Sequence, residues 1–207
     1  MKGKFVGMNL KSKYLIIILA VIIIKINFSI NVKAEEYSRF NNISIEDGLS
    51  QATVETMMQD SKGYIWLGTN DGLDRYNGYT FKKYSYEKGQ ENSLVNGYIL
   101  DIKEDSEGNI WVATAAGISK IYNDGEKVQN YTSDSESGNL SNDNTATMLI
   151  SSSNKIYVGT AEGINLYDKK TDKFNLIYPE LKEEYINSLA EDKYGNIWAG
   201  TENGLYK

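Results

Sequence analysis

The sequence has no cysteine and no histidine, and these two absences exclude several kinds of chemistry. Without cysteine the chain can form neither a disulfide nor a thiolate nucleophile. Without histidine it has no Ser-His-Asp triad, no imidazole metal ligand and no histidine that accepts a phosphoryl group.

The N-terminal segment 1–34 has the pattern of a signal peptide. Four of its lysines, Lys2, Lys4, Lys11 and Lys13, precede an unbroken apolar run at residues 14–24, and small residues near Ala34 suit cleavage. The run is about 11 residues long, whereas a membrane-spanning helix needs about 20. Because apolar residues continue beyond Lys25, an uncleaved N-terminal anchor is the alternative. Either way we expect export to an extracellular or periplasmic location, secreted or membrane-anchored.

The charge of the chain beyond residue 34 excludes nucleic acid as a partner. Six of the 22 basic side chains are lysines of segment 1–34, which has no Asp or Glu, so 16 basic side chains remain against 28 acidic ones, a net charge of −12. Nucleic acids and anionic lipids are bound mainly through Lys and Arg, so such an acidic domain repels them.

A motif of about ten residues recurs four times after the signal segment. Asp60-Ser61-Lys62-Gly63-Tyr64-Ile65-Trp66-Leu67-Gly68-Thr69 is the first copy, and strong copies begin at Asp105 and Asp192. A weaker copy begins at Ser151 and has Tyr157 in place of Trp. The four aromatic positions lie 45, 46 and 41 residues apart. The shared positions are Asp60, Gly63, Trp66, Gly68, Thr69, Gly72, Asp105, Gly108, Trp111, Thr114, Gly117, Tyr157, Gly159, Thr160, Gly163, Asp192, Gly195, Trp198, Gly200, Thr201 and Gly204.

The motif predicts a turn, a strand and a tight hairpin. Asp and Gly three residues apart favour a β-turn, and in the weak copy Ser151 and Asn154 can make the same turn. Thr followed three residues later by Gly predicts a short hairpin loop closed by a left-handed glycine. The second copy has one extra residue between Gly117 and Tyr122, which predicts a bulge there.

Strand signals around each motif complete a unit of four short strands. Apolar pairs three residues apart precede each strong motif (Val54/Met57, for example) and follow the first three (Phe81/Tyr84). We expect all-β structure, because the runs are short, β-branched or aromatic, and bounded by turn residues. The predicted units are 52–86, 97–133, 144–178 and an incomplete 185–207, with an additional outer strand at 38–44.

A unit of about 45 residues with a tryptophan on its second strand is typical of a β-propeller blade. The amino-acid sequence of these repeats, including Glu46-Asp47-Gly48-Leu49-Ser50 before the first one, resembles that of the two-component regulator propeller family. The resemblance runs from about Tyr37 to the end of the chain. The resemblance implies seven-bladed propellers outside the cell, followed by a transmembrane helix and a histidine kinase or diguanylate cyclase. It therefore implies an N-terminal fragment of such a receptor, residues 35–207, with four blades.

Two arrangements of these blades are compatible with the sequence. In an open arc cut from a seven-bladed ring, the end faces stay bare and favour self-association. In a closed four-bladed ring, residues 38–44 would complete the last blade. We expect the arc.

The resemblance gives a function and an alternative. We expect an extracellular ligand-sensing region that works with further blades and signalling domains, and the alternative is a secreted binding or scaffold module without signalling output. The identity of the ligand is unknown, and its expected class is a carbohydrate or another small molecule. Exposed loop aromatics such as Tyr64, Tyr79 and Tyr194 are its candidate contacts.

We expect neither enzymatic activity nor a cofactor or metal. Propeller sialidases need three converging arginines, whereas this chain has only Arg39 and Arg75, and streptogramin lyases use a histidine. The Asp-x-x-Gly turns lack the alternating carboxylates of a calcium loop. Paired carboxylates could still cleave a glycosidic bond, but turns and solvated faces explain the acidic residues better. The four aromatic anchors are expected to be buried between blades rather than to stack on a sugar.

Overall fold

The computed structural model describes residues 10–11, 14, 18–19, 40–134 and 139–207. The chain divides into two units, Met1–Asn41 and Asn42–Lys207. Most of the expected signal peptide, residues 1–34, lies outside the described residues, although the few that are described there are helical. None of the helices in the described parts is long and apolar enough to cross a membrane.

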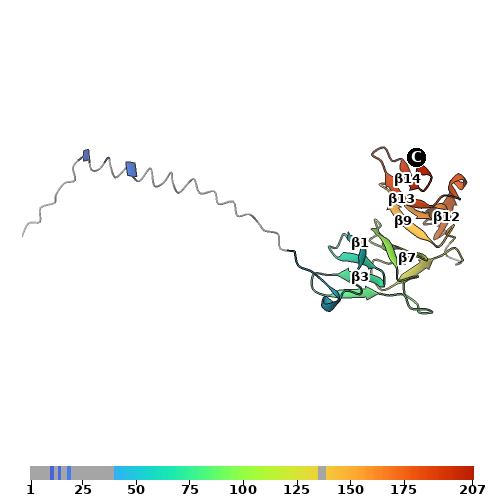
Figure 1. The fold of residues 1–207 in the computed structure, drawn as a ribbon, viewed down its shortest axis with the longest axis horizontal. Helices are drawn as coiled ribbons and strands as arrows, with labels where there is room; N and C mark the ends of the chain where they lie inside the picture. The colour runs from blue at the N-terminus through green and yellow to red at the C-terminus, as the bar shows by residue number, and fades with distance from the viewer. Residues whose placement is uncertain (1–9, 12–13, 15–17, 20–39, 135–138) are drawn as a thin grey trace, which may run out of the picture. The chain divides into compact units, whose positions relative to one another are not determined.

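The unit Asn42–Lys207 consists of four antiparallel sheets that follow one another in chain order (Figure 1). The first sheet has β1 (Val54–Gln59), β2 (Ile65–Thr69), β3 (Gly72–Tyr76) and β4 (Phe81–Tyr84), and the second has β5 (Ile99–Glu104), β6 (Ile110–Thr114), β7 (Gly117–Ile121) and β8 (Val128–Tyr131). The third sheet has β9 (Thr145–Ile150), β10 (Ile156–Thr160), β11 (Gly163–Asp168) and β12 (Lys173–Ile177). The fourth has β13 (Ile186–Glu191), β14 (Ile197–Thr201) and β15 (Gly204–Tyr206).

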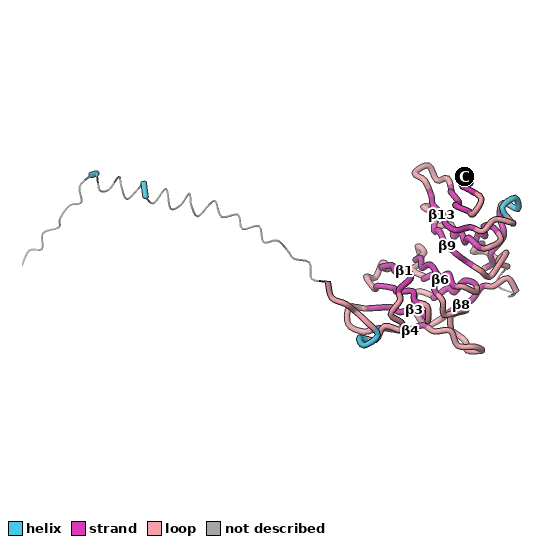
Figure 2. The backbone as a smooth tube through the Cα atoms, viewed as in Figure 1, coloured by secondary structure: helices cyan, strands magenta, loops and turns pink. Residues whose placement is uncertain are grey.

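The prediction of tandem four-stranded blades in an all-β chain is confirmed. Within residues 40–134 and 139–207 the helices are the single 3₁₀ turns η1 (Ile45–Asp47) and η2 (Pro179–Leu181), as Figure 2 shows. The expected incomplete blade is the fourth, which has three strands among these residues.

The blades form an open arc. The inner strands β1, β5, β9 and β13 contact one another in that order, and no comparable contact joins β13 to β1 among the described residues. The side chain of Met57 on β1 is 72% exposed, whereas Ile102 at the same position of β5 is 2% exposed against the first blade. The first blade therefore has a bare face where a preceding blade would pack.

A bulge in every inner strand explains the apolar spacing of three. The pairing register shifts between the first and third residues of β1, β5, β9 and β13. A bulge adds one residue, so side chains three apart point to the same face. Ile99 and Ile102 accordingly share one apolar cluster.

In the outer strands, apolar residues three apart point to opposite faces of the sheet. Their pairing with the third strand is regular, so residues three apart point to opposite faces. Val128 packs against the cluster between the first and second blades, whereas Tyr131 lies in the cluster between the second and third. The outer strands of the second and third blades thus each join two neighbouring interfaces.

Two sequence-based expectations are wrong. Residues 40–44 form no strand, and Phe40 is 98% exposed. Instead, Ser44 caps η1: its hydroxyl accepts a hydrogen bond from the Glu46 N–H, and Asp47 accepts one from the Ser44 N–H at 2.8 Å. Residues 38 and 39 lie outside the described residues. A four-bladed ring completed by segment 38–44 is therefore not formed.

The bulge expected between Gly117 and Tyr122 is absent as well. The register from Thr114↔Gly117 to Ile110↔Ile121 is regular. Ile121, and not Tyr122, is the equivalent of Tyr76 in the first blade.

Candidate functional site

The shared aspartate of the motif ties the turn to the tryptophan of the second strand. Asp105 Oδ1 accepts hydrogen bonds from the N–H groups of Glu107 and Asn109, and its Oδ2 accepts one from Trp111 Nε1 at 2.8 Å. Asp60 with Trp66 and Asp192 with Trp198 repeat this geometry at 2.8 and 3.0 Å. Bonds from Asn196 and Trp198 lower the pKa of Asp192 below its ordinary value. These carboxylates are occupied by their own turns, as a structural role predicts.

A cation from the third strand of the blade, or from the residue after it, covers each indole. Lys120, opposite Trp111 in the β6–β7 register, has its ammonium 4.9 Å from the indole centre. Arg75 and Lys207 lie 5.7 and 5.2 Å from the rings of Trp66 and Trp198. In the weak third copy Leu166 takes this position opposite Tyr157. That copy therefore lacks the carboxylate, the indole and the cation together.

The predicted hairpin is confirmed in all four blades. The hydroxyls of Thr69, Thr114, Thr160 and Thr201 donate to the carbonyl of the glycine three residues later at 2.8–3.2 Å. Those four glycines have positive φ angles. Asn154 also has a positive φ, of 58°, and its N–H donates to the Ser151 carbonyl, so the weak copy keeps the turn.

The aromatic anchors lie where the sequence predicted. Trp66, Trp111 and Tyr157 are buried between neighbouring blades. Trp198 is half-buried, because it faces the open end of the arc. All four are on the second strand of their blade.

The leucine that enters each blade was missed by the sequence analysis. Leu94, Leu140 and Leu181 are buried in the three clusters between blades, and Leu49 is buried before the first blade. Each lies five residues before the first residue of its inner strand, a constant spacing that could have revealed it.

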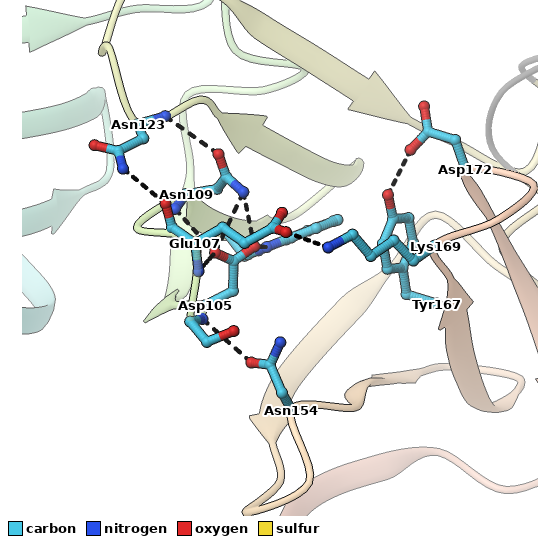
Figure 3. Close-up of polar contacts among 10 residues, drawn as sticks. Asp105, Glu107, Asn109, Asn123, Asn154, Tyr167, Lys169 and Asp172 are labelled. Carbon is cyan, nitrogen blue, oxygen red and sulfur yellow. Dashed lines mark hydrogen bonds and ion pairs between the residues drawn. The ribbon is translucent and has the colours of Figure 1, made fainter.

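A polar cluster around Asp172 lies at the interface of the second and third blades, and Figure 3 shows its bond with Tyr167. Asp172 accepts hydrogen bonds from Tyr131 and Tyr167 at 2.7 and 2.6 Å and from Gln129 Nε2 at 2.6 Å. The Lys120 ammonium lies 5.6 Å from the Tyr167 ring. Two further contacts join the same blades: Lys169 pairs with Glu107, and Asn154 Oδ1 accepts a hydrogen bond from the N–H of Ser106 at 3.2 Å (Figure 3).

This polar cluster holds blades together and offers no reactive group. Burial and the bonds to Asp172 raise the pKa of the Tyr131 and Tyr167 hydroxyls above their ordinary value. Burial acts to raise the pKa of Asp172, but the bonds from both tyrosines and Gln129, with the charge of Lys120, outweigh it and lower that pKa. The tyrosines stay protonated and the aspartate ionised, as a static ion–hydroxyl network requires.

The candidate ligand contacts divide into two kinds. Tyr64 packs partly buried against the first cluster, with the Arg75 guanidinium 4.7 Å from its ring centre, so it is a packing residue. Tyr79 and Tyr194 are 90% and 77% exposed on loops. Among the described residues no group of three or more acidic side chains is arranged to hold a metal ion.

A groove of about 550 Å³ lies between the third and fourth blades. Tyr157 and Ile164 line it from the third blade, and Ile197, Ala199 and Tyr206 line it from the fourth.

Comparison with known proteins identifies the repeats. The family model "Two component regulator propeller" matches residues 48–71, 93–116 and 180–203. Each match runs from the entry leucine through the Thr-x-x hairpin of the first, second or fourth blade. The chain carries two-component regulator propeller repeats.

The curated relative "Histidine kinase P4" from Formosa agariphila is 37% identical over 67 residues, which are 32% of this chain and 5% of the relative. The extracellular domain of a putative hybrid two component system from B. thetaiotaomicron aligns with 20% identity and a TM-score of 0.48 over 80% of this chain and 30% of that one. The chain thus spans a small part of both.

Two further solved structures share the fold. A streptogramin B lyase aligns with a TM-score of 0.60 and 16% identity over 83% of this chain and 59% of the lyase. The WD40 β-propeller domain of Doa1 aligns with a TM-score of 0.54 and 13% identity over 74% of this chain and 49% of that one. These likenesses show the propeller fold alone.

Proposed function

We propose that this chain is the extracellular ligand-sensing propeller region of a two-component-type signalling receptor. The observation that carries the proposal is the match of three blades to the two-component regulator propeller model. The partial identity to a histidine kinase supports the same role. The chain would act with further blades, a membrane segment and an output domain of a longer receptor.

The proposal assigns binding, and no catalysis, to this region. The sequence has no histidine or cysteine, and the acidic residues of the motif are held in structural hydrogen bonds. A propeller lyase shares the fold, but a shared fold does not transfer chemistry. Tyr79 and Tyr194 are exposed loop aromatic side chains able to stack on a carbohydrate or another planar or apolar small molecule.

A ligand screen followed by a genetic test examines this role. A binding oligosaccharide raises the melting temperature, since saturation at about 100 times Kd stabilises the folded state by about 2.7 kcal/mol. Replacing Tyr79 or Tyr194 by alanine should reduce that shift, while the partly exposed Tyr86→Ala serves as the matched control.

Deleting the gene should then abolish the transcriptional response of the cell to the same ligand. An unchanged response would contradict the sensing role and favour a secreted binding module without signalling output.

A further inference from the structure

A polar groove of about 220 Å³ lies between the first and second blades. Its three sides are β4, the connection 85–93 and the β7–β8 hairpin at Gly125 and Glu126. All three sides lie between residues 82 and 126, so the groove does not depend on how the chain begins or ends. It is smaller than the roughly 300–1,000 Å³ of sites for drug-sized molecules, so a ligand that fits it is small.

The connection 85–93 forms one side of this polar groove because it is long. Nine residues separate Tyr84, the last of β4, from the entry leucine Leu94, whereas three separate Ile177, the last of β12, from Leu181. The shorter connection forms the single turn η2 instead. Surface loops that a rigid scaffold holds in place are where binding residues concentrate.

Hydrogen bonds to the second blade hold the connection in place. Asn92 Oδ1 accepts a hydrogen bond from the Val128 N–H at 3.2 Å. The Ser93 carbonyl accepts one from Asn130 Nδ2 at 3.0 Å. The polar groove is therefore formed before any ligand arrives, which reduces the entropy that binding costs.

The polar groove has free charged groups of both signs. Lys82 is already paired with Glu126 at 2.7 Å. The side chains of Lys83, Gln90 and Glu91 also line the groove, are exposed, and form no hydrogen bond or ion pair with the described residues. They offer a ligand one ammonium, one amide and one carboxylate.

We propose that the polar groove binds a small zwitterion of the amino-acid type. The ligand carboxylate pairs with the Lys83 ammonium, and the ligand ammonium pairs with the Glu91 carboxylate, with Glu87 as a further acceptor in the lining. Hydrogen bonds that involve ionised groups are roughly twice as strong as neutral ones, so a molecule with both charges gains more here than a neutral or singly charged one. Gln90 favours a ligand with a polar side chain. For its place in the cell the site rests on the proposed sensing role.

Saturation-transfer difference NMR on the full 207-residue chain tests the proposal, since this method detects weak ligands. Each standard L-amino acid is titrated separately, and at least one with a polar side chain should bind saturably. The analogue of that amino acid without its ammonium group, and the analogue without its carboxylate, should each bind at least tenfold more weakly. D-galactose, which is neutral and rich in hydroxyls, should not compete.

Substitutions in the chain locate the site. Lys83→Ala and Glu91→Ala should each weaken binding at least fivefold, and they should leave the melting temperature unchanged because both side chains are exposed and unbonded. Lys170→Ala and Glu202→Ala remove the same two charges from exposed loops of the third and fourth blades, and they should leave binding unchanged.

Three results would overturn the proposal. Absence of saturable binding by every amino acid removes the site, and equal binding of a singly charged analogue or of D-galactose shows a different ligand class. Binding that is lost in Tyr79→Ala or Tyr194→Ala but kept in Lys83→Ala and Glu91→Ala places the ligand on those loops, and the sensing role then stands without the groove. Groove binding with an unchanged response of the deletion strain to the same amino acid supports the site and contradicts the sensing role alone.

Discussion

Asp105 shows how one side chain links three parts of a blade. Its carboxylate closes the turn, holds the Asn109 amide and accepts the indole N–H of Trp111, all within a largely buried site. Hydrogen bonds to a charged acceptor are stronger than neutral ones. The third blade keeps the turn through Ser151 and has Tyr157 in place of the tryptophan, so the lack of a carboxylate there leaves no indole N–H without an acceptor.

We predict that Asp105→Ala lowers the free energy of unfolding by about 1.5–3 kcal/mol, because it leaves the buried indole N–H of Trp111 without its acceptor. Denaturant unfolding of both proteins measures the difference. Asp71→Ala, at an exposed position of a hairpin loop, is the control and should change stability by less than about 0.5 kcal/mol. Equal effects of the two substitutions would show that the carboxylate–indole bond contributes little.

Neighbouring strands approach closely where the motif has glycine after the second strand's aromatic residue. A Cβ on Gly68 would lie 2.6 Å from the Ile99 Cγ2 atom of the next inner strand. Gly159 meets Ile186 at the same distance. The second blade has Ala113 instead, and the inner strand of the next blade begins with the smaller Thr145. This glycine of the repeat therefore allows close packing against the inner strands of its own blade and of the next one, whereas the hairpin glycines serve backbone conformation.

We predict that Gly68→Ala destabilises the protein by about 1–3 kcal/mol, because the added methyl overlaps the buried Ile99 side chain. Thermal and denaturant unfolding measure the loss. Gly97→Ala is the matched control: its Cβ would meet no atom closer than 3.7 Å, and its φ angle is not in the left-handed region. The idea fails if Gly97→Ala is as harmful as Gly68→Ala.

At the scale of the whole blade unit, the arc ends in two faces that neighbouring blades would cover. Val54 and Met57 are exposed at one end, and Leu205 and the half-buried Trp198 lie at the other. Equivalent side chains inside the arc are buried in apolar clusters. The seven-bladed ring implied by the family resemblance stays a prediction.

We predict that the chain binds a hydrophobic dye and associates in solution, because apolar patches exposed on a sheet face favour both. Light scattering and dye fluorescence measure these properties. The double variant Met57→Lys/Leu205→Lys should reduce dye fluorescence and shift the chain toward monomer. A monodisperse, dye-free wild-type chain with a cooperative melt would contradict this prediction.

Local chemistry explains why much of the fold could be predicted from the sequence. Trp66 and Gly72 occupy the predicted strand and left-handed hairpin position, because turn conformation and strand periodicity depend on residues a few positions apart. The four aromatic residues, which recur every 41 to 46 residues, predicted the number of blades for the same reason. The candidate ligand contacts could be predicted only in part, since Tyr64 has the same loop pattern as Tyr194 but lies under Arg75.

By itself the sequence determined the repeat, the turns, the all-β class and the absence of histidine and cysteine chemistry. Only the tertiary structure decided that segment 40–44 forms no strand and ends at Ser44, the N-cap of η1. It also decided that Leu94 fills an interface and that a groove lies beside β15. The physical reason is that these features depend on contacts between blades. The pattern of apolar residues in one strand does not show whether a neighbouring blade is present to cover that strand.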